Sequence, residues 1–296
     1  MKKVIAIVGP TAIGKTKISI EIAKHYNLDI ISADSVSVYK KLDIGSAKPT
    51  KEEMDGVKHF LIDDLEPNSQ YDVEMFQRKA REIIEKNNPI IIAGGTGLYV
   101  QSVLFDYHFD ANKRNYDFEE KYKDLTDVEL YNVLKEKDNT IEGRIHPNNR
   151  KRVLRALEIL EDTNSSVTSF NGKNNPYYDS YIIYLNVSDR DVLYDRINKR
   201  VDKMINDGLE KEVRDLYDLN ILPNAIGYKE FIPYFKNEIK IEEVIENIKK
   251  NSRHLAKRQM TWFRNQMPTH FFEVNLDNID ITINEIIKEL DKFLEG

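Results

Sequence analysis

The stretch KVIAIVGPTAIGKT, residues 3–16, decides the fold of this 296-residue chain. It opens with the apolar run Val4–Val8, and it continues with Gly9, four further residues and Gly14-Lys15-Thr16. This spacing is the G-x-x-x-x-G-K-[ST] phosphate loop. A helical pattern of isoleucines follows it. A buried strand, a glycine-rich loop and a helix in this order are the context that a phosphate loop requires.

The loop suits a phosphate for physical reasons. Its glycines let successive backbone N–H groups turn inward, and the following helix adds its positive N-terminal end. Lys15 supplies a point charge, and the Thr16 hydroxyl is a candidate Mg²⁺ ligand. Because the loop recognises only a chain of phosphates, it leaves open whether the ligand is ATP or another phosphate compound. The candidate phosphate-binding residues are Gly9, Pro10, Thr11, Ala12, Ile13, Gly14, Lys15 and Thr16.

Composition narrows the class of protein. Hydrophobic residues make up 41% of the chain, which suits one large domain or a domain with an insertion. The absence of cysteine excludes disulfides, thiolate zinc sites and a cysteine nucleophile. The apolar run near the N-terminus is too short for a signal peptide, and no segment approaches a membrane span. We therefore expect a soluble cytoplasmic protein, with a monomer as the default.

Short apolar runs alternate with helical patterns along most of the chain, which predicts an α/β fold with a mostly parallel sheet covered on both faces. Residues 106–180 break this rhythm, because they are polar and carry helical patterns at 127–137 and 149–162. We therefore expect a core of residues 1–105 and 181–296 with a mainly helical insertion, 106–180. The expected strands are 3–8, 28–32, 59–62, 89–93, 181–187 and 269–273, and the expected core helices include 15–26, 72–86, 97–105, 189–207, 209–218 and 242–264.

The charged residues are distributed unevenly along the chain. The net charge is −6, yet residues 143–157 and 247–272 contain no acidic residue and many basic ones. Two basic segments on an acidic protein are typical of a surface that binds a polyanion. Two solvated helix faces explain the pattern equally well.

Polar residues follow two of the expected strands. Asp34 and Ser35 lie beyond the second strand, where open parallel sheets bind their ligands. An Asp at this position serves as a metal ligand, a general base or a helix N-cap. Thr96 follows the fourth strand, where a triphosphate hydrolase carries an acidic residue for Mg²⁺. Its hydroxyl weakens the nucleotidase interpretation, although Asp63 or Asp64 could supply the missing acid.

Two further patterns have both a functional and a structural interpretation. Arg196 and Arg200 share a helix face and suit phosphate oxygens, or they form an exposed pair matched to nearby acidic residues. Trp262 and Phe263 lie among basic residues, which is typical of a strand of nucleic acid stacking on aromatic rings. The same two aromatic residues could instead anchor a helix to the core.

In combination and in this order, the motifs resemble the tRNA dimethylallyltransferases, also called isopentenyl-tRNA transferases. The resemblance extends from residue 4 to about residue 266, and the absence of cysteine for a C-terminal zinc finger indicates the bacterial form. Ser37 and Asn149 depart from the family pattern. The matching stretches are GPTAIGKT, ISADSVSVYKKLDIGSAKP, HFLIDDLEP, IIIAGGTGLYVQSVL, IHPNNRKRVLRALEI, RVDKMINDGLEKEV, AIGYKE and KRQMTWFRNQ.

The resemblance implies a fold like that of P-loop NTPases and a prenyl transfer reaction. The phosphate loop and Mg²⁺ would hold the diphosphate of dimethylallyl diphosphate. The dimethylallyl group would pass to the exocyclic amine of the adenine 3′-adjacent to the anticodon (position 37), in tRNAs that read codons beginning with U. Diphosphate would be released, and no obligate protein partner is expected.

The resemblance also implies roles for individual residues. Asp34 would be the general base, Thr96 would hydrogen-bond near the bridging oxygen of the donor, and Arg200 would steady the leaving diphosphate. The residues that it implies for tRNA binding are Asp34, Ser35, Val36, Ser37, Lys151, Arg152, Val153, Leu154 and Arg155.

Three other functions remain open at this point. A small-molecule kinase shares the loop but predicts a carboxylate in place of Thr96. A dimethylallyltransferase acting on free adenylate has no need of the two basic segments. A non-catalytic RNA-binding module leaves Lys15 and Asp34 without a purpose.

Overall fold

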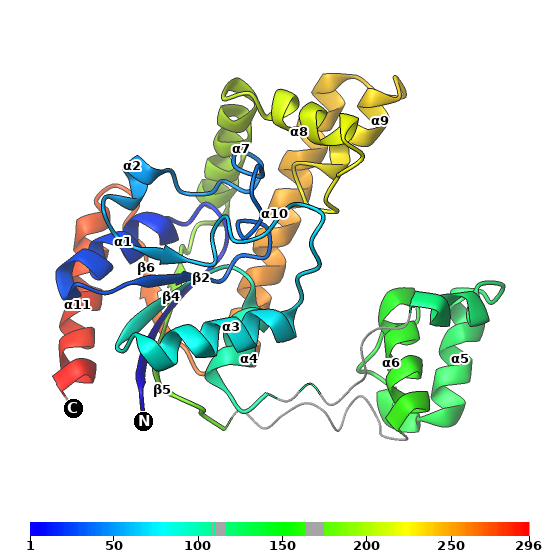
Figure 1. Ribbon diagram of the computed structural model, residues 1–296, viewed down its shortest axis with the longest axis horizontal. Helices are drawn as coiled ribbons and strands as arrows, with labels where there is room; N and C mark the ends of the chain where they lie inside the picture. Colours follow the sequence, from blue (N-terminus) through cyan, green and yellow to red (C-terminus); the bar gives the residue numbers. More distant parts are fainter. Residues whose placement is uncertain (108, 110–115, 164–174, 296) are drawn as a thin grey trace. The chain divides into compact units, whose positions relative to one another are not determined.

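Among the described residues, six parallel strands form one sheet in the order β3-β2-β4-β1-β5-β6 (Figure 1). The computed structural model describes residues 1–107, 109, 116–163 and 175–295. The predicted α/β fold with a parallel sheet is confirmed. The strands are β1 (Lys3–Val8), β2 (Ile30–Ser32), β3 (His59–Phe60), β4 (Ile90–Gly94), β5 (Asp179–Asn186) and β6 (His270–Glu273).

β1 lies at the centre of the sheet, between β4 and β5. Residues 4–8 are all fully buried, because helices cover both faces of the sheet and a central parallel strand meets water on neither face. In the register, Val8 lies beside Gly94 of β4 and beside Tyr184 of β5. The phosphate loop and the loop after β4 therefore leave the sheet at the same edge.

Helices cover the two faces of the sheet (Figure 1). One face carries α1 (Lys15–Tyr26) and α11 (Ile279–Glu295), whose isoleucines and leucines share a hydrophobic cluster with β1 and β5. The other face carries α3 (Val73–Lys86) and α4 (Gly97–Leu104). The long helix α10 (Ile241–Gln266) packs against α4 and α7 (Arg190–Asn206).

A second hydrophobic cluster joins α7, α8 (Leu209–Asp218), η3 (Lys229–Phe231), α9 (Ile232–Phe235) and the start of α10. Glu212 of α8 ties this cluster to the loop that follows β2. Its carboxylate accepts the backbone N–H groups of residues 43, 44 and 45 at 3.0, 2.8 and 3.0 Å, and the Tyr228 hydroxyl at 2.8 Å. A Cβ on Gly45 would lie 2.5 Å from the Tyr228 ring, so only glycine fits there.

The smaller unit, Phe105–Asn175, is distinct from the core of Met1–Leu104 and Pro176–Gly296. It contains η1 (Tyr116–Tyr122), α5 (Asp127–Lys137), η2 (Asn139–Ile141) and α6 (Arg150–Thr163). A capping box at Thr126 starts α5, and leucines of α5 pack against Val153 and Leu157 of α6. Residues 108, 110–115 and 164–174 of the expected insertion lie outside the described residues.

Two backbone hydrogen bonds join the chain where it leaves the core and where it returns. Within the core, the N–H of Tyr177 donates to the carbonyl of Leu104 at 2.8 Å. Within the smaller unit, the N–H of Asp106 donates to the carbonyl of Asn175 at 2.9 Å. The two ends of the insertion therefore lie side by side.

The structure shortens two expected strands and adds several short helices. β2 begins at Ile30, because Asn27 ends α1 with a φ of 53° and the chain needs further residues to become extended. β3 ends at Phe60, because Leu61 adopts a φ of 61°. The sequence pattern did not predict α2 (Lys51–Met54), α9 or the 3₁₀ helices, which are too short to show a period. No helix in the described ranges is long and apolar enough to span a membrane.

Candidate active site

The phosphate loop joins β1 to α1 and has the backbone geometry that its glycines predict. Gly9 has a φ of 155°, and a Cβ there would lie 2.6 Å from the carbonyl oxygen of Leu185. Gly14, the N-cap of α1, has a φ of 106°, which favours glycine. Ile13 is fully buried and anchors the loop to the core. The first N–H groups of α1 begin at Lys15 and Thr16, so an anion at the loop meets the positive end of the helix.

Three cationic side chains bond to this loop. The Nζ of Lys15 donates to the carbonyl of Pro10 at 2.8 Å. From α7, the Nη1 of Arg200 donates to Thr11 Oγ1 at 2.9 Å, and the Nε of Arg196 donates to the carbonyl of Ala12 at 3.0 Å. The interpretation of the two arginines as an exposed pair matched to nearby acids is therefore wrong.

Lys15 and Arg200 are half-buried and lie close enough for their charges to interact. Burial and the charge of Arg200 lower the pKa of Lys15 to about 7, and the negative charge of Asp34 opposes this shift. Burial also lowers the pKa of Arg200, against the charges of Asp34 and Glu53. Two desolvated cations that repel each other are stabilised by an anion bound between them.

Asp34 follows β2 and uses one of its two carboxylate oxygens to hold its own loop. Its Oδ1 accepts the backbone N–H of Val36 at 2.8 Å and that of Ser37 at 3.1 Å. Its Oδ2 accepts no hydrogen bond from the described residues. Among the described residues, turns and not a helix follow Asp34, so the helix N-cap alternative is wrong. Oδ1 holds the turn, and Oδ2 is left to accept a proton.

Thr96 stands at the start of α4, next to the segment that carries Asp34. Its backbone N–H donates to the carbonyl of Ala33 at 3.2 Å, and its carbonyl accepts the N–H of Tyr99 at 3.0 Å. A Cβ on Gly94 would lie 2.3 Å from the Ala33 oxygen, so glycine permits this close approach. Within the described residues, the Thr96 hydroxyl makes no hydrogen bond. Thr96 and Asp34 therefore lie on adjoining backbone segments at the carboxyl edge of the sheet.

An aromatic cluster lies on the Asp34 side of the site. The rings of Tyr39, Tyr71 and Tyr99 meet edge to face, and Phe76 stacks on Tyr99 at 4.5 Å between centroids. Burial raises the pKa of Tyr99, and Asp34 adds to the shift, which places this ring within reach of the carboxylate charge. The sequence pattern does not mark these residues as functional, because aromatic residues are common in protein cores.

Gln259 of α10 is a further site residue that sequence reasoning missed. Its Oε1 accepts the backbone N–H of Thr11 at 2.8 Å, and its Nε2 donates to the carbonyl of Gly95 at 3.0 Å. One amide thus contacts both the phosphate loop and the loop of Thr96. The only available signal was its place in the motif KRQMTWFRNQ.

The family profile described as IPP transferase matches residues 37–266. The chain belongs to this family. The tRNA dimethylallyltransferase of Oceanobacillus iheyensis is 42% identical to it over 305 residues, covering 99% of this chain and 97% of that protein. The tRNA dimethylallyltransferase of Bacillus cereus is 44% identical over 309 residues, covering 100% of this chain and 95% of that protein.

Solved structures of other members of the IPP transferase family show the same fold. The crystal structure of a tRNA delta(2)-isopentenylpyrophosphate transferase from Staphylococcus epidermidis has a TM-score of 0.73, 39% identity and coverage of 99% of both chains. A eukaryotic dimethylallyltransferase acting on tRNA has a TM-score of 0.83 and 28% identity, over 97% of this chain and 78% of that chain. The predicted family resemblance is confirmed.

The structure narrows the tRNA-binding set expected of an IPP transferase. Ser37 is 4% exposed, Val153 is fully buried and Leu154 is 5% exposed, so these side chains pack inside the protein and do not present a surface to tRNA. The two apolar residues of the segment 151–155 lie on the buried face of an amphipathic helix, and their basic neighbours lie on its outer face. The exposed or half-exposed side chains that remain are Asp34, Ser35, Val36, Lys151, Arg152 and Arg155, of which Arg155 pairs with Glu158 at 2.6 Å.

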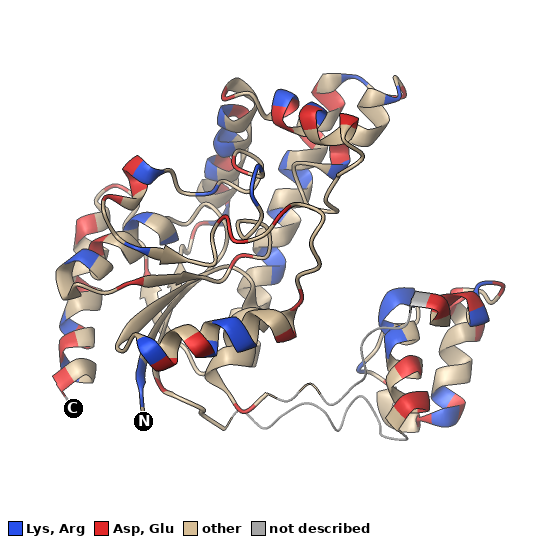
Figure 2. Ribbon diagram, in the orientation of Figure 1, with Lys and Arg blue, Asp and Glu red and all other residues tan. Residues whose placement is uncertain are grey.

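Figure 2 shows basic residues along α6 and α10, the helices of the two acid-free segments. Some of these cations make structural contacts and others are exposed. Arg150 donates to the carbonyls of Tyr122 and Leu125 at 2.7 Å each and so fastens α6 within its unit. Arg264 donates to Asn186 at 2.9 Å. Part of each segment therefore serves the fold. The exposed lysines and arginines of the two helices are Lys151, Arg152, Lys250, Lys257, Arg258 and Arg264.

In this IPP transferase fold, the aromatic pair of α10 and the two acidic residues after β3 have structural roles. Phe263 is fully buried near Tyr184, and Trp262 lies against Gly97, where a Cβ would come within 2.1 Å of the indole. These aromatic residues anchor α10 to the core and do not stack on nucleic acid. Asp63 and Asp64 pair with Lys48 and Lys79 at 2.5 Å each, which gives both carboxylates a structural partner.

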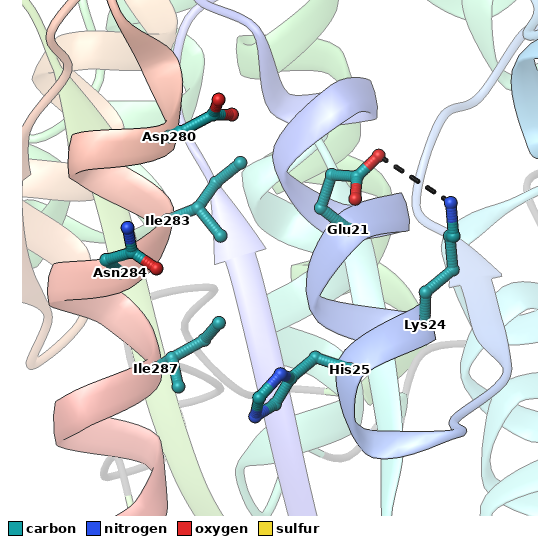
Figure 3. A pocket seen from close by; sticks show the side chains of 7 residues that line it. All are labelled: Glu21, Lys24, His25, Asp280, Ile283, Asn284 and Ile287. Atoms are coloured by element: carbon teal, nitrogen blue, oxygen red, sulfur yellow. Dashed lines mark ion pairs between the residues drawn. The ribbon is translucent and has the colours of Figure 1, made fainter.

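A separate hollow of about 400 Å³ lies between α1 and α11 (Figure 3). Its lining comes from Glu21, Lys24 and His25 of α1 and from Asp280, Ile283, Asn284 and Ile287 of α11. Lys24 pairs with Glu21 at 4.0 Å and with Asp55 at 2.5 Å. The hollow lies near the C-terminal end of α1, whereas the phosphate loop lies at its start, so it is not part of the candidate active site.

Proposed function

We propose that this protein transfers the dimethylallyl group of dimethylallyl diphosphate to the exocyclic amine of the adenine 3′-adjacent to the anticodon in tRNA. The proposal rests on one observation above all. Lys15 and Arg200 reach the phosphate loop, while Asp34 lies close enough to change the pKa of both. Cations for a leaving diphosphate and a carboxylate for an incoming amine thus occupy one site.

The bond changes of this reaction match these groups. A bond forms between the adenine nitrogen and the first carbon of the dimethylallyl group, and the bond from that carbon to the bridging oxygen breaks. The diphosphate leaves with the electron pair, and Lys15 and Arg200 neutralise its growing charge. The amine proton passes to Oδ2 of Asp34, since Oδ1 is held by two backbone N–H groups. The Thr96 hydroxyl then serves as a donor to the bridging oxygen.

Mg²⁺ fits this site through Thr16 and the diphosphate itself. The Thr16 side chain is exposed at the start of α1, beside the loop. Within the described residues, no cluster of three or more His, Cys, Asp or Glu side chains could hold a metal. Mg²⁺ is commonly held by one or two protein ligands, substrate phosphates and water, which suits such a site. When bound, it would add positive charge for the diphosphate oxygens.

Recognition of tRNA is proposed for exposed side chains of both units. Lys151, Arg152 and Arg155 of α6 would contact phosphates, and Ser35 would lie near the target base. The target adenine is stacked in the anticodon loop and must be extruded to react, at a cost of about a few kcal/mol. We further propose that the substrates are tRNAs that read codons beginning with U, and that the reaction takes place in the cytoplasm.

One incubation tests the proposal and separates its rivals. Radiolabelled dimethylallyl diphosphate with Mg²⁺ is supplied to the protein with bulk tRNA, with AMP or with buffer. Label in tRNA alone supports the proposal, and label in AMP indicates the free-adenylate enzyme. In a parallel incubation with ATP and no dimethylallyl diphosphate, consumption of ATP indicates the kinase. No label in either acceptor overturns prenyl transfer.

A further inference from the structure

We propose that Gln259 is a positioning residue that couples the phosphate loop to the Thr96 loop during prenyl transfer. The inference rests on the proposed function. It assigns to one amide the task of keeping the diphosphate and the Thr96 hydroxyl at a fixed separation.

The two hydrogen bonds of Gln259 use the two different ends of its amide. The oxygen accepts from the Thr11 N–H at 2.8 Å, and the nitrogen donates to the Gly95 carbonyl at 3.0 Å. Because a backbone N–H only donates and a carbonyl only accepts, these partners fix the orientation of the amide. No side chain with only donors or only acceptors can make this bridge.

The surroundings of Gln259 leave it little freedom. Its neighbours on α10, Ala256 and Met260, are buried in the hydrophobic cluster and fix the position of the helix. A Cβ on Gly95 would lie 2.2 Å from the amide nitrogen, so the absence of a side chain at Gly95 makes room for the bridge. The glycine and the glutamine are 164 positions apart and are complementary in shape.

The bridge connects the two halves of the proposed reaction. On one side, Thr11 is held at its N–H by Gln259 and at its hydroxyl by Arg200 at 2.9 Å. On the other side, the Gly95 carbonyl directly precedes Thr96. A displacement of about 1 Å between reacting groups can slow a reaction about a hundred-fold. Without the bridge, the phosphate loop and the Thr96 loop are free to shift relative to each other.

A double-mutant cycle tests this coupling. Gln259→Met keeps the length of the side chain and removes both hydrogen bonds. We expect it to slow single-turnover transfer to an anticodon stem–loop RNA about ten-fold, as for the loss of two neutral hydrogen bonds. Since Gln259 acts on the rate through Thr96, the double variant with Thr96→Ala should be about as slow as Thr96→Ala alone. The cycle isolates this interaction from a general loss of stability.

Gln77→Met is the matched control. Gln77 also bridges two elements, donating its amide to the Ser102 carbonyl at 2.6 Å, but this hydrogen bond joins α3 to α4 and involves neither the phosphate loop nor the Gly95 carbonyl. The Gln77→Met variant should have a lower melting temperature and a transfer rate within about two-fold of the wild-type rate, as expected when a lost hydrogen bond affects only stability. If Gln259→Met does not fold, Gln259→Glu replaces it in the cycle, since it keeps the acceptor for Thr11.

Two results would overturn the coupling: a Gln259 variant with the wild-type transfer rate, or a double variant whose loss equals the product of the single losses. Failure of the proposed function would look different. In that case the wild-type protein itself would transfer no dimethylallyl group to RNA, whereas the two results above require an active wild-type enzyme.

Discussion

Binding of the diphosphate donor should draw a proton onto Lys15. Burial and Arg200 lower the pKa of Lys15 to about 7 in the unliganded protein, from an ordinary value of 10.5. A bound diphosphate favours the charged ammonium and raises this pKa again. Below pH 7 the lysine is already protonated, and above pH 7 binding must take up a proton. The affinity for dimethylallyl diphosphate should therefore fall as the pH rises above 7.

The size of this effect follows from the pKa. The unliganded protein is half protonated at Lys15 at pH 7 and about one-hundredth protonated at pH 9, so the affinity should fall about fifty-fold between these values. The effect on folding has the opposite sign in the same range. Because the unfolded chain holds the proton up to pH 10.5, the free energy of unfolding of the unliganded protein should rise between about pH 7 and 10.5.

Calorimetric titration of the donor without tRNA measures both consequences. At pH 8, titrations in two buffers of different ionisation enthalpy should show uptake of nearly one proton per donor bound, whereas at pH 5.5 Lys15 itself should take up none. Lys15→Arg is the control, because a guanidinium remains protonated throughout and the affinity should then vary little with pH. An equal donor affinity at pH 7 and pH 9 in the wild-type protein would refute the reasoning.

Three further predictions concern other parts of the molecule. Asp34→Asn should leave donor and tRNA binding within a few-fold and lower the single-turnover rate by about 10², the size expected for a positioned base; equal rates would remove Asp34 from that role. Replacing Lys151, Arg152 and Arg155 with Ala should make the log–log salt dependence of tRNA binding shallower by about 0.7–0.9 for each lost phosphate contact. An unchanged slope in a variant that melts normally would contradict the assignment. Glu212→Ala should lower the free energy of unfolding by about 3–5 kcal/mol, because several donors lose a charged acceptor; urea denaturation measures this, and a loss below about 1 kcal/mol would show that the tie is weak.

The parts of the fold that local sequence encodes were predictable. The run Val4–Val8 followed by Gly9 and Gly14 specifies a buried strand, a loop with positive φ and a helix start, and each of these depends on neighbours within a few residues. The spacing of Arg196 and Arg200 likewise placed both on one helix face, and both reach the loop.

The contacts that depend on distant partners were not predictable. Gln259 and Glu212 bond to segments more than 160 positions earlier in the chain, and neither lies in a local pattern that reveals its partner. For Val153 and Leu154, in contrast, the local sequence pattern was sufficient. Their helical spacing indicates burial, whereas the motif treats them together with their basic neighbours, and the structure follows the spacing.

Two backbone hydrogen bonds, Leu104–Tyr177 and Asp106–Asn175, hold the two ends of the smaller unit together. The smaller unit is therefore an insertion that a short turn could replace. Since its two ends already lie side by side, a short turn in its place would leave the crossover from α4 to β5 closed over the same span. Excision would keep the strand order of the sheet and the phosphate loop intact. Over evolution, the same geometry lets the smaller unit gain, lose or exchange residues without changing the register of the strands that position the phosphate loop, Asp34 and Thr96.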